Sequence, residues 1–273
     1  MDAIAIRAVS DLPALRTVED LQQVIWGTSE REIVPAHQLL AIVAAGGVVL
    51  GAFLPDGRMI GFCYGFVGRR EGRPLFYSHM AGVLAEYRGR EVGFQLKRAQ
   101  REAALARGLD WMVWTFDPLQ GTNAYFNLHR LGVRAERYLV NYYGEMADDL
   151  NRGVDSDRLE VDWALNSPDV VRRLQAARPE PPADIAGVSA ILAASGDPPR
   201  PVFPAAAPEA PSVLLGVPSD FSALRRSDLG LAREWRIQAR AAFQRCFARG
   251  YVAVDFVRGG AVGQYILRSA DAR

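Results

Sequence analysis

The sequence is poor in cysteine. Its 273 residues contain only Cys63 and Cys246, which lie far apart in apolar surroundings. Two such thiols do not build a disulfide framework, so we expect both to be free and buried. The sequence therefore predicts a fold held together without disulfide bonds, which suits a reducing cytoplasm.

An excess of one charge and long apolar runs are also missing. The formal net charge is +1, which gives no electrostatic reason to expect nucleic acid or an acidic membrane as partner. No apolar run approaches the roughly 18 residues that span a bilayer. Residues 1–4 lack the basic region and apolar stretch of a secretory signal. We therefore expect a cytoplasmic protein.

What the sequence does contain is typical of a globular domain. Hydrophobic residues make up 49% and charged residues 23%, and the length suffices for two domains. Strand and helix patterns alternate over residues 1–165. Apolar spacing and turn residues predict helices at 12–25 (with Ser10 as N-cap), 37–45, 89–107 and 121–131, and strands at 4–9, 48–53, 59–67, 76–83, 111–116, 134–143 and 158–165.

The composition changes after residue 165. Residues 178–211 carry nine prolines, which oppose long helices and central strands. We interpret 166–211 as a connection, with a short element at 188–193, between a domain at 1–165 and a region at 212–273. That last region shows strand, helix and hairpin patterns. Ala248-Arg249-Gly250 ends its helix as Ala106-Arg107-Gly108 ends the first long helix, so a degenerate second copy of one unit is a hypothesis.

A glycine-containing loop joins a predicted strand to the predicted helix 89–107. Such a loop presents unpaired backbone N–H groups, and the helix dipole adds partial positive charge. Gly89 and Gly93 let the backbone approach a ligand closely. Arg88 and Arg90 add cationic donors. The loop fits a diphosphate group, and an ordinary surface loop is the alternative.

The run from Ser78 to Gly93 resembles motif A of the GNAT superfamily of acyl-CoA N-acyltransferases, whose loop reads Gln/Arg-x-x-Gly-x-Gly/Ala. The resemblance implies a GNAT-like α/β fold with a mixed sheet. It also implies that the loop holds the pyrophosphate of acyl-CoA and that the preceding strand pairs with the pantetheine arm. Glu91 departs from the pattern, which prefers glycine there. The cofactor-binding residues implied are Ala81, Gly82, Val83, Arg88, Gly89, Arg90, Glu91, Val92 and Gly93.

The run from Asp117 to Gly132 resembles motif B of the same superfamily, an Asn-containing helix that ends in Leu-Gly. It implies that Asn123 and Asn127 orient the thioester or the pantetheine amides; helix capping is the alternative for Asn123. Many members protonate the leaving thiolate with a tyrosine four residues before that glycine. Here Leu128 occupies the position, so the standard acid is missing or replaced.

A narrower resemblance extends over nearly the whole chain. Residues 141–144, 151–153, 156–159 and 231–251 are similar to a bacterial GNAT branch with an extra C-terminal region. This branch makes a succinyl donor and an amino-acid acceptor hypotheses to test. Arg134, Arg152 and Arg158 are candidate ligands for a carboxylate, with structural roles as the alternative.

Three residues are candidates for proton transfer. His79 lies on the strand before the loop and titrates near neutral pH, so it is the candidate base; a structural histidine is the alternative. Asp117 follows the next strand and could polarise the amine or cap the turn before Pro118. Tyr125 shares a helix face with His129 and is a candidate acid, with aromatic packing as the alternative. His129 itself is expected at the surface.

These observations together predict an enzyme. We expect a GNAT-type N-acyltransferase that moves an acetyl or other short acyl group from CoA to a small primary amine by direct attack, without a metal. A CoA-binding or ligand-sensing protein whose chemistry has decayed is the alternative, motivated by Glu91 and Leu128. The oligomeric state stays open, with a homodimer as one arrangement.

Overall fold

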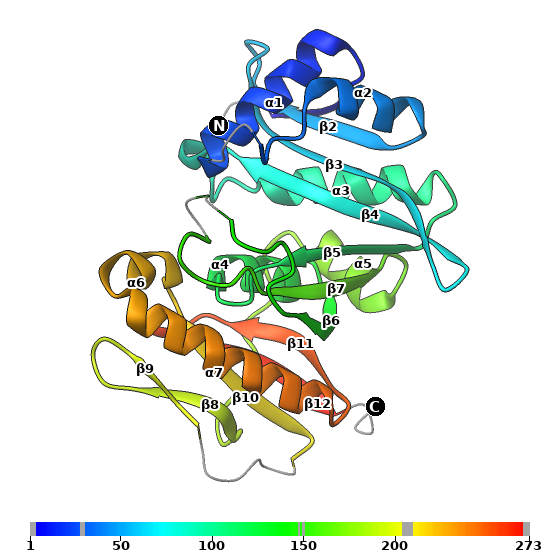
Figure 1. Cartoon of the computed structure of the whole chain (residues 1–273). Coiled ribbons are helices and arrows are strands. Elements are labelled where there is room, and N and C mark those ends of the chain that lie inside the picture. The colour runs from blue at the N-terminus through cyan, green and yellow to red at the C-terminus, as the bar shows by residue number, and fades with distance from the viewer. Residues whose placement is uncertain (1–3, 28–30, 147, 149–150, 204–209, 270–273) are drawn as a thin grey trace. The chain divides into compact units, whose positions relative to one another are not determined.

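The computed structural model describes residues 4–27, 31–146, 148, 151–203 and 210–269; Figure 1 shows the elements. The chain divides into two compact units. The first comprises Met1–Trp114, Ala147–Leu150 and Ala164–Asn166, and the second Thr115–Met146, Asn151–Trp163 and Ser167–Arg273. The main division thus falls inside a strand instead of after residue 165. Compactness depends on which strands pair, and proline content alone does not determine that.

The first helix shows how local sequence sets the ends of an element. Helix α1 (Leu12–Trp26) begins at Asp11, whose carboxylate accepts a hydrogen bond from the Ala14 N–H at 3.0 Å. The N-cap is therefore Asp11 and not the predicted Ser10. The helix ends at Gly27, whose φ of 61° is left-handed. Of the apolar side chains at three- and four-residue spacing, Leu15, Val18 and Leu21 are buried as the pattern predicted, whereas Ile25 is half-buried and Leu12 is exposed.

The sheet of the first unit places two helices on one face and one on the other. Phe62 and Tyr64 pack with α1 and α2 (Ala36–Ala44) in one apolar cluster. Cys63, between them, faces α3 (Val92–Leu105), where its Sγ lies 3.7 Å from the Leu96 carbonyl oxygen. The strands follow the order β1 (Ala5–Ala8), β2 (Val48–Phe53), β3 (Met59–Arg70), β4 (Arg73–Val83) and β5 (Trp111–Phe116).

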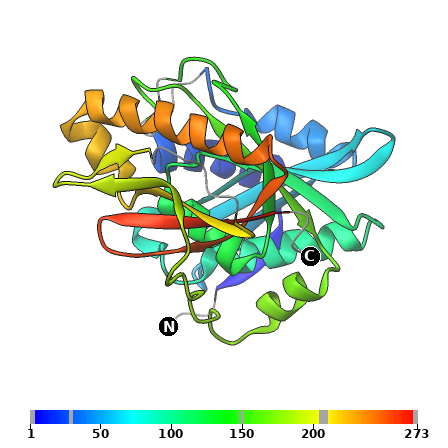
Figure 2. The same ribbon diagram turned by 90° about the horizontal axis from the view of Figure 1, so that it is seen from below.

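The second unit is built around another run of strands. They follow the order β7-β6-β11-β12-β10-β8-β9, and α7 (Leu229–Phe247) runs along one face of them, as Figure 2 shows. The strands are β6 (Arg134–Leu139), β7 (Arg158–Ala164), β8 (Ala190–Ser195), β9 (Arg200–Val202), β10 (Ser212–Pro218), β11 (Tyr251–Val257) and β12 (Val262–Ser269). The other helices are α4 (Gly121–Ala124), α5 (Pro168–Gln175) and α6 (Phe221–Ser227).

The proline-rich segment is more ordered than the sequence predicted. Helix α5 starts at Ser167, whose hydroxyl caps the Val170 N–H, with Pro168 in the first turn, where proline is tolerated. Strand β8 pairs in parallel with β10, and β9 pairs antiparallel with β8. Prolines at helix starts and in a short terminal strand are compatible with this order. Residues 204–209 lie outside the described part.

The strand order contains an internal repeat. In the chain, β5 is followed by α4, β6 and β7, and the strands lie in the order β5-β7-β6. Likewise β10 is followed by α6, α7, β11 and β12, and these strands lie in the order β10-β12-β11. We call the group from β10 to β12 the C-terminal arm. It meets the first group where Ala135 of β6 pairs with Ala253 of β11. In the observed topology α7 therefore corresponds to the helix after β5. The repeat proposed from the sequence matched it instead with the helix before β5.

No helix among the described residues has both the length and the apolar composition needed to cross a membrane.

Candidate functional site

Strands β4 and β5 pair over only part of their lengths. Their parallel pairing joins Phe76 to Met112 and Tyr77 to Val113, and among the described residues it goes no further. On its other edge β4 stays paired with β3 up to Val83. The β4 edge from Ser78 to Val83 therefore leaves the β5 partner and offers backbone amides in an extended conformation. Such an edge can pair with an extended ligand that carries amide groups.

A β-bulge lies where the two strands separate. Tyr64 of β3 pairs with Met80 and Gly65 pairs with Ser78, so His79 is an extra residue without a partner on β3. Its exposed imidazole lies among aromatic rings, 5.3 Å from the Tyr64 centroid and 6.2 Å from that of Tyr77. Partial burial lowers the pKa of His79, so the neutral imidazole predominates at neutral pH. The candidate base is thus at the separation point in its proton-accepting form.

The predicted diphosphate loop has two left-handed residues. Gly89 has φ 76°, and a Cβ built there meets nothing within 4 Å, so open space lies above it. Glu91 has φ 61° and forms the N-cap of α3 without a side-chain cap. This conformation explains why glycine suits that position. The first helical hydrogen bond of α3 runs from Gln95 N–H to Glu91 O, so Val92 and Gly93 precede the hydrogen-bonded ladder.

Two arginines lie against the Tyr87 ring beside this loop, and a third follows Tyr87 in the chain. The guanidinium groups of Arg58 and Arg90 lie 5.4 Å and 5.2 Å from the Tyr87 ring centroid, and Arg58 also donates to the tyrosine hydroxyl. Arg88 donates from Nε to the Val83 carbonyl oxygen at 3.2 Å. All three arginines are exposed. Arg58 comes from the turn between β2 and β3, and no local sequence signal connected it to the loop.

The residues of β4 that precede the loop also have structural roles. A Cβ at Gly82 would lie 2.9 Å from side-chain atoms of Ile25 and Trp26 at the end of α1. Packing alone therefore requires glycine there. Ala81 is exposed and Val83 half-buried. Their assignment to the cofactor remains a prediction, as does that of Gly82.

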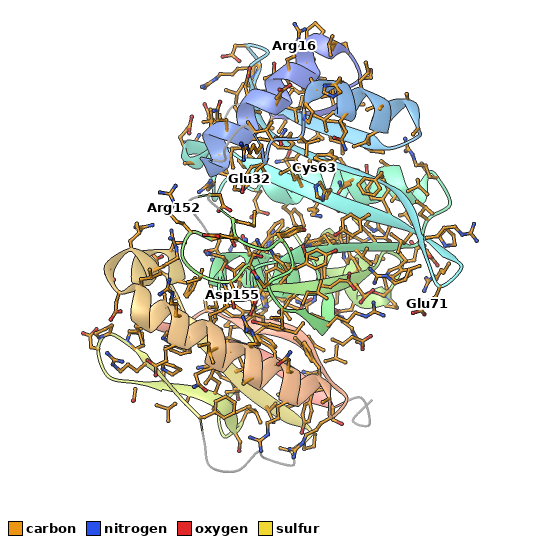
Figure 3. The ribbon with its side chains drawn as sticks, in the orientation of Figure 1. Arg16, Glu32, Cys63, Glu71, Arg152 and Asp155 are labelled. Carbon is orange, nitrogen blue, oxygen red and sulfur yellow. The ribbon has the colours of Figure 1, made fainter. Side chains whose placement is uncertain are left out.

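A buried lysine lies on the α3 side of the same region. Lys97 is 3% exposed, and its Nζ donates to Ser78 Oγ at 2.7 Å and to Gln100 Oε1 at 3.3 Å. Burial lowers its pKa to about 7. Cys63, labelled in Figure 3, is buried on β3, and burial raises its thiol pKa to about 12. The thiol is therefore protonated at neutral pH, which fits its expected role as an unreactive core residue.

Asp117, a candidate catalytic residue, is held in a buried ion pair of the second unit. Arg236 of α7 donates to both carboxylate oxygens, at 2.7 and 2.9 Å, and the Leu119 N–H donates at 2.9 Å. Burial alone raises the Asp117 pKa, but the Arg236 charge and hydrogen bonds outweigh it and lower the pKa. This arrangement favours a structural role, since the carboxylate is a weak base and is already occupied.

The helix that carries Tyr125 differs from the predicted one. Only Gly121–Ala124 is α-helical, and Tyr125–Arg130 forms a π-helix. The rings of Tyr125 and His129 stack with centroids 4.8 Å apart, so the shared face is confirmed. The Arg258 guanidinium lies 3.7 Å from the Tyr125 centroid. π-Helical turns are often found at functional sites, so Tyr125 stays a candidate, with packing as its observed role.

The expectation that His129 lies at the surface was wrong. It is 3% exposed, with Nδ1 2.9 Å from Asp255 Oδ1 and Nε2 3.0 Å from the Glu180 carbonyl oxygen. Both neighbours are hydrogen-bond acceptors, so only the imidazolium can donate to both. The Asp255 hydrogen bond is the main reason that the His129 pKa is raised. His129 therefore joins the π-helix, β11 and the segment around Glu180 through its two ring nitrogens.

The remaining candidates of the second unit have unequal exposure. Asn123 is exposed, whereas Asn127 is 4% exposed and Leu128 fully buried. Arg158 is 8% exposed and donates to Asn151 Oδ1 at 3.1 Å, which favours a structural role. Arg152 and Asp155 come from the loop between β6 and β7 (Figure 3). Within the described residues, no three His, Cys, Asp or Glu side chains form a metal-ligand group.

The first unit combines an antiparallel run into β4, a bulge, separation from a parallel β5, and a glycine-containing loop before α3. This is the arrangement that the resemblance to the GNAT superfamily implied. No family model and no curated protein matches the chain.

Solved acetyltransferase structures are similar to part of the chain. The NatC complex bound to Gag peptide and CoA matches at 14% identity over 60% of this chain and 99% of the other, with TM-score 0.48. Arabidopsis thaliana Naa50 with a bisubstrate analogue matches at 19% over 58% and 97%, with TM-score 0.46. A phosphinothricin acetyltransferase from Sinorhizobium meliloti with AcCoA matches at 18% over 58% and 86%, with TM-score 0.45.

Proposed function

We propose that this chain is a CoA-dependent N-acyltransferase. It would move an acetyl or other short acyl group, succinyl included, from CoA to a small primary amine such as an amino acid. The observation that carries the proposal is the free β4 edge from Ser78 to Val83, which starts at the bulge and leads to the loop before α3. One end offers amide pairing, and the other offers backbone N–H groups and arginines.

The residues of this edge match the chemistry of acyl-CoA in three places. The amides of β4 at Ala81–Val83 would pair with the two pantetheine amides. The N–H groups at Val92 and Gly93 and the space above Gly89 would hold the diphosphate. The exposed Arg88 and Arg90, together with Arg58, would supply positive charge.

The reaction needs one proton removed and one supplied. The amine nitrogen attacks the thioester carbonyl carbon, the C–N bond forms, and the C–S bond breaks. His79 would accept the proton that the amine loses, because its lowered pKa keeps it neutral. The sequence also predicts roles for Tyr125, Asp117, Asn123 and Asn127, which belong to the second unit, and these roles stay predictions.

A second function has support in two observations. Leu128, at the position of the usual acid, is fully buried, and Glu91 takes a left-handed conformation at the diphosphate loop. Both weaken the catalytic arrangement without removing the β4 edge. A CoA-binding sensor without turnover is therefore the alternative.

Calorimetry and an activity screen separate the two functions. Acetyl-CoA and succinyl-CoA are titrated into the protein, and amines are then screened for release of free CoA thiol. Gly89→Ala should weaken binding at least tenfold. Gly108→Ala is the matched control, since Gly108 has φ 74° and equally open surroundings at the far end of α3. Binding without turnover on any amine supports the sensor, and absence of CoA binding refutes both functions.

A further inference from the structure

The second unit contains a cavity of about 520 Å³ that has no part in the proposed acyl transfer. Its lining comes from β6, β11 and β12, from α5, and from the segment around Glu180. All of these residues belong to the same compact unit. A volume of this size is typical of sites for small molecules.

Strand pairing fixes the positions of two arginines beside β11. Arg268 of β12 pairs with Val252, and Ala135 of β6 pairs with Ala253, so Arg134 is the neighbour of Val254. Arg134 and Arg268 therefore flank β11 from its two sides, two strand spacings apart across the sheet and two residues apart along it, so their backbones are about 12 Å apart. Both line the cavity, as do Val252 and Val254. The cavity thus has an apolar strip between two guanidinium groups.

The other charges of the cavity neutralise one another. Arg172 Nε lies 2.7 Å from Glu180 Oε1, and Arg173 Nε lies 3.1 Å from Asp169 Oδ2. Asp255 Oδ1 lies 2.9 Å from His129 Nδ1, and its Oδ2 lies 3.9 Å from Arg173 Nη2. These contacts account for the three carboxylates that line the cavity.

The charges of Arg134 and Arg268 are left over. Neither guanidinium has an ion-pair partner among the described residues, and both side chains are exposed. Asp162, the register neighbour of Arg134 on β7, is not part of the cavity lining. Exposed arginines are commonly solvated. These two differ because they line one cavity from opposite sides of an apolar strip, so the cavity has two guanidinium groups that no carboxylate of the described residues pairs with.

We propose that this cavity binds a small organic dianion, whose two acidic groups are held by Arg134 and Arg268 and whose short apolar chain lies over Val252 and Val254. Arginine binds carboxylate and phosphate oxygens in the same bidentate manner, so the shared chemistry is an acidic oxygen pair at each end. The site is independent of the proposed acyl transfer, because every residue in it belongs to the second unit.

Isothermal titration of the full chain without acyl-CoA tests the site. The probes are glutarate, its neutral analogue glutaramide, and inorganic phosphate. Glutarate should bind saturably and glutaramide should not. Arg134→Gln and Arg268→Gln should each raise the glutarate Kd at least tenfold. Arg249→Gln is the matched control, because Arg249 is exposed, lies outside the cavity and changes the net charge equally; its Kd should stay within twofold.

Three results would overturn the proposal. The first is no saturable binding of glutarate or phosphate. The second is equal binding of glutaramide, which would show that charge is not recognised. The third is equal weakening by Arg249→Gln, which would show only a general charge effect. Saturable phosphate binding without glutarate binding would assign the site to phosphate esters instead of dicarboxylates, and the same two arginine variants must then weaken phosphate binding. Circular dichroism of each variant establishes that it is folded.

Discussion

The Nζ of Lys97 on α3 lies 2.7 Å from the Ser78 Oγ on β4 and 3.7 Å from the ring centroid of Trp114 on β5. Ser78 and Trp114 are the residues that directly follow the last β4–β5 pair. The ammonium group therefore occupies the point at which the strands separate. Lys97 is also the only lysine among the 273 residues, and the other 31 of the 32 cationic side chains are arginines. Only lysine can become neutral there, because arginine keeps its charge.

Lys97→Met should stabilise the protein in a pH-dependent way. An unfolded lysine titrates near 10.5 and the folded one near 7, so unfolding takes up a proton between these values. The free energy of unfolding of the wild type should then fall by roughly 4–5 kcal/mol as pH decreases from about 10 to about 7. The gain of the Met variant is smaller by the hydrogen bonds of Lys97 that it loses. Urea unfolding at pH 7, 8.5 and 10 measures the difference. An equal difference at all three values would contradict the burial argument.

His79→Gln should remove the proton acceptor while keeping a polar side chain. If the enzyme is active, kcat should fall about 10²- to 10⁴-fold. In the wild type, kcat/KM should rise with pH and level off above an apparent pKa below 6.5, since the neutral imidazole is the active form. The variant should lack this inflection. His37→Gln on α2 is the control, because His37 is also exposed; a similar loss there would argue against a specific role of His79.

Glu91→Gly should tighten CoA binding and stabilise the fold. The change removes a left-handed non-glycine residue, worth about 1 kcal/mol, and a carboxylate beside the diphosphate loop. Glu71→Gly is a close match, since Glu71 has φ 50° and is an exposed residue of the β3–β4 turn. The thermal unfolding temperature should rise in both variants. Calorimetry should show tighter CoA binding only for Glu91→Gly. An equal increase in CoA affinity in both variants would mean that the loop is not part of the binding site.

Asp117→Asn should destabilise the second unit by about 3–5 kcal/mol, because it leaves the buried Arg236 charge without its partner. The double variant Asp117→Leu/Arg236→Met should recover most of the loss. Asp110→Asn is the comparison: Asp110 pairs with Arg73 at 3.0 Å, but both side chains are more than half exposed, so the cost should stay below about 1 kcal/mol. Equal costs in urea unfolding would mean that the Asp117 pair is not effectively buried.

Local patterns predicted the elements of the first unit well, because apolar spacing and glycine turns act within a few residues. The loop at Arg88–Gly93 was found in this way, and so was the departure at Glu91, whose backbone conformation now accounts for it. The bulge at His79 could not be predicted. It depends on β4 having one residue more than β3 between paired positions, which is a property of two strands together.

Contacts between distant parts of the chain explain the other differences. Asp117 and Arg236 are 119 residues apart, so nothing near Asp117 indicated that its carboxylate is occupied. His129 is buried because Asp255 and Glu180 accept from both ring nitrogens, and neither lies nearby in sequence. Strand β8 lies in the segment 166–211, which was predicted to be a connection, and it pairs with β10. In each of these three cases the deciding partner lies far away along the chain.

The pairing of Ala135 on β6 with Ala253 on β11 has a consequence for truncation. Without β11, β6 would be an edge strand whose backbone groups could pair with another molecule. The C-terminal arm supplies that neighbour from within the same chain, and so serves as a built-in protection against association. A fragment that ends after β7 would lose this cover. Solubility of such a fragment would therefore be limited by the exposed strand as well as by lost stability.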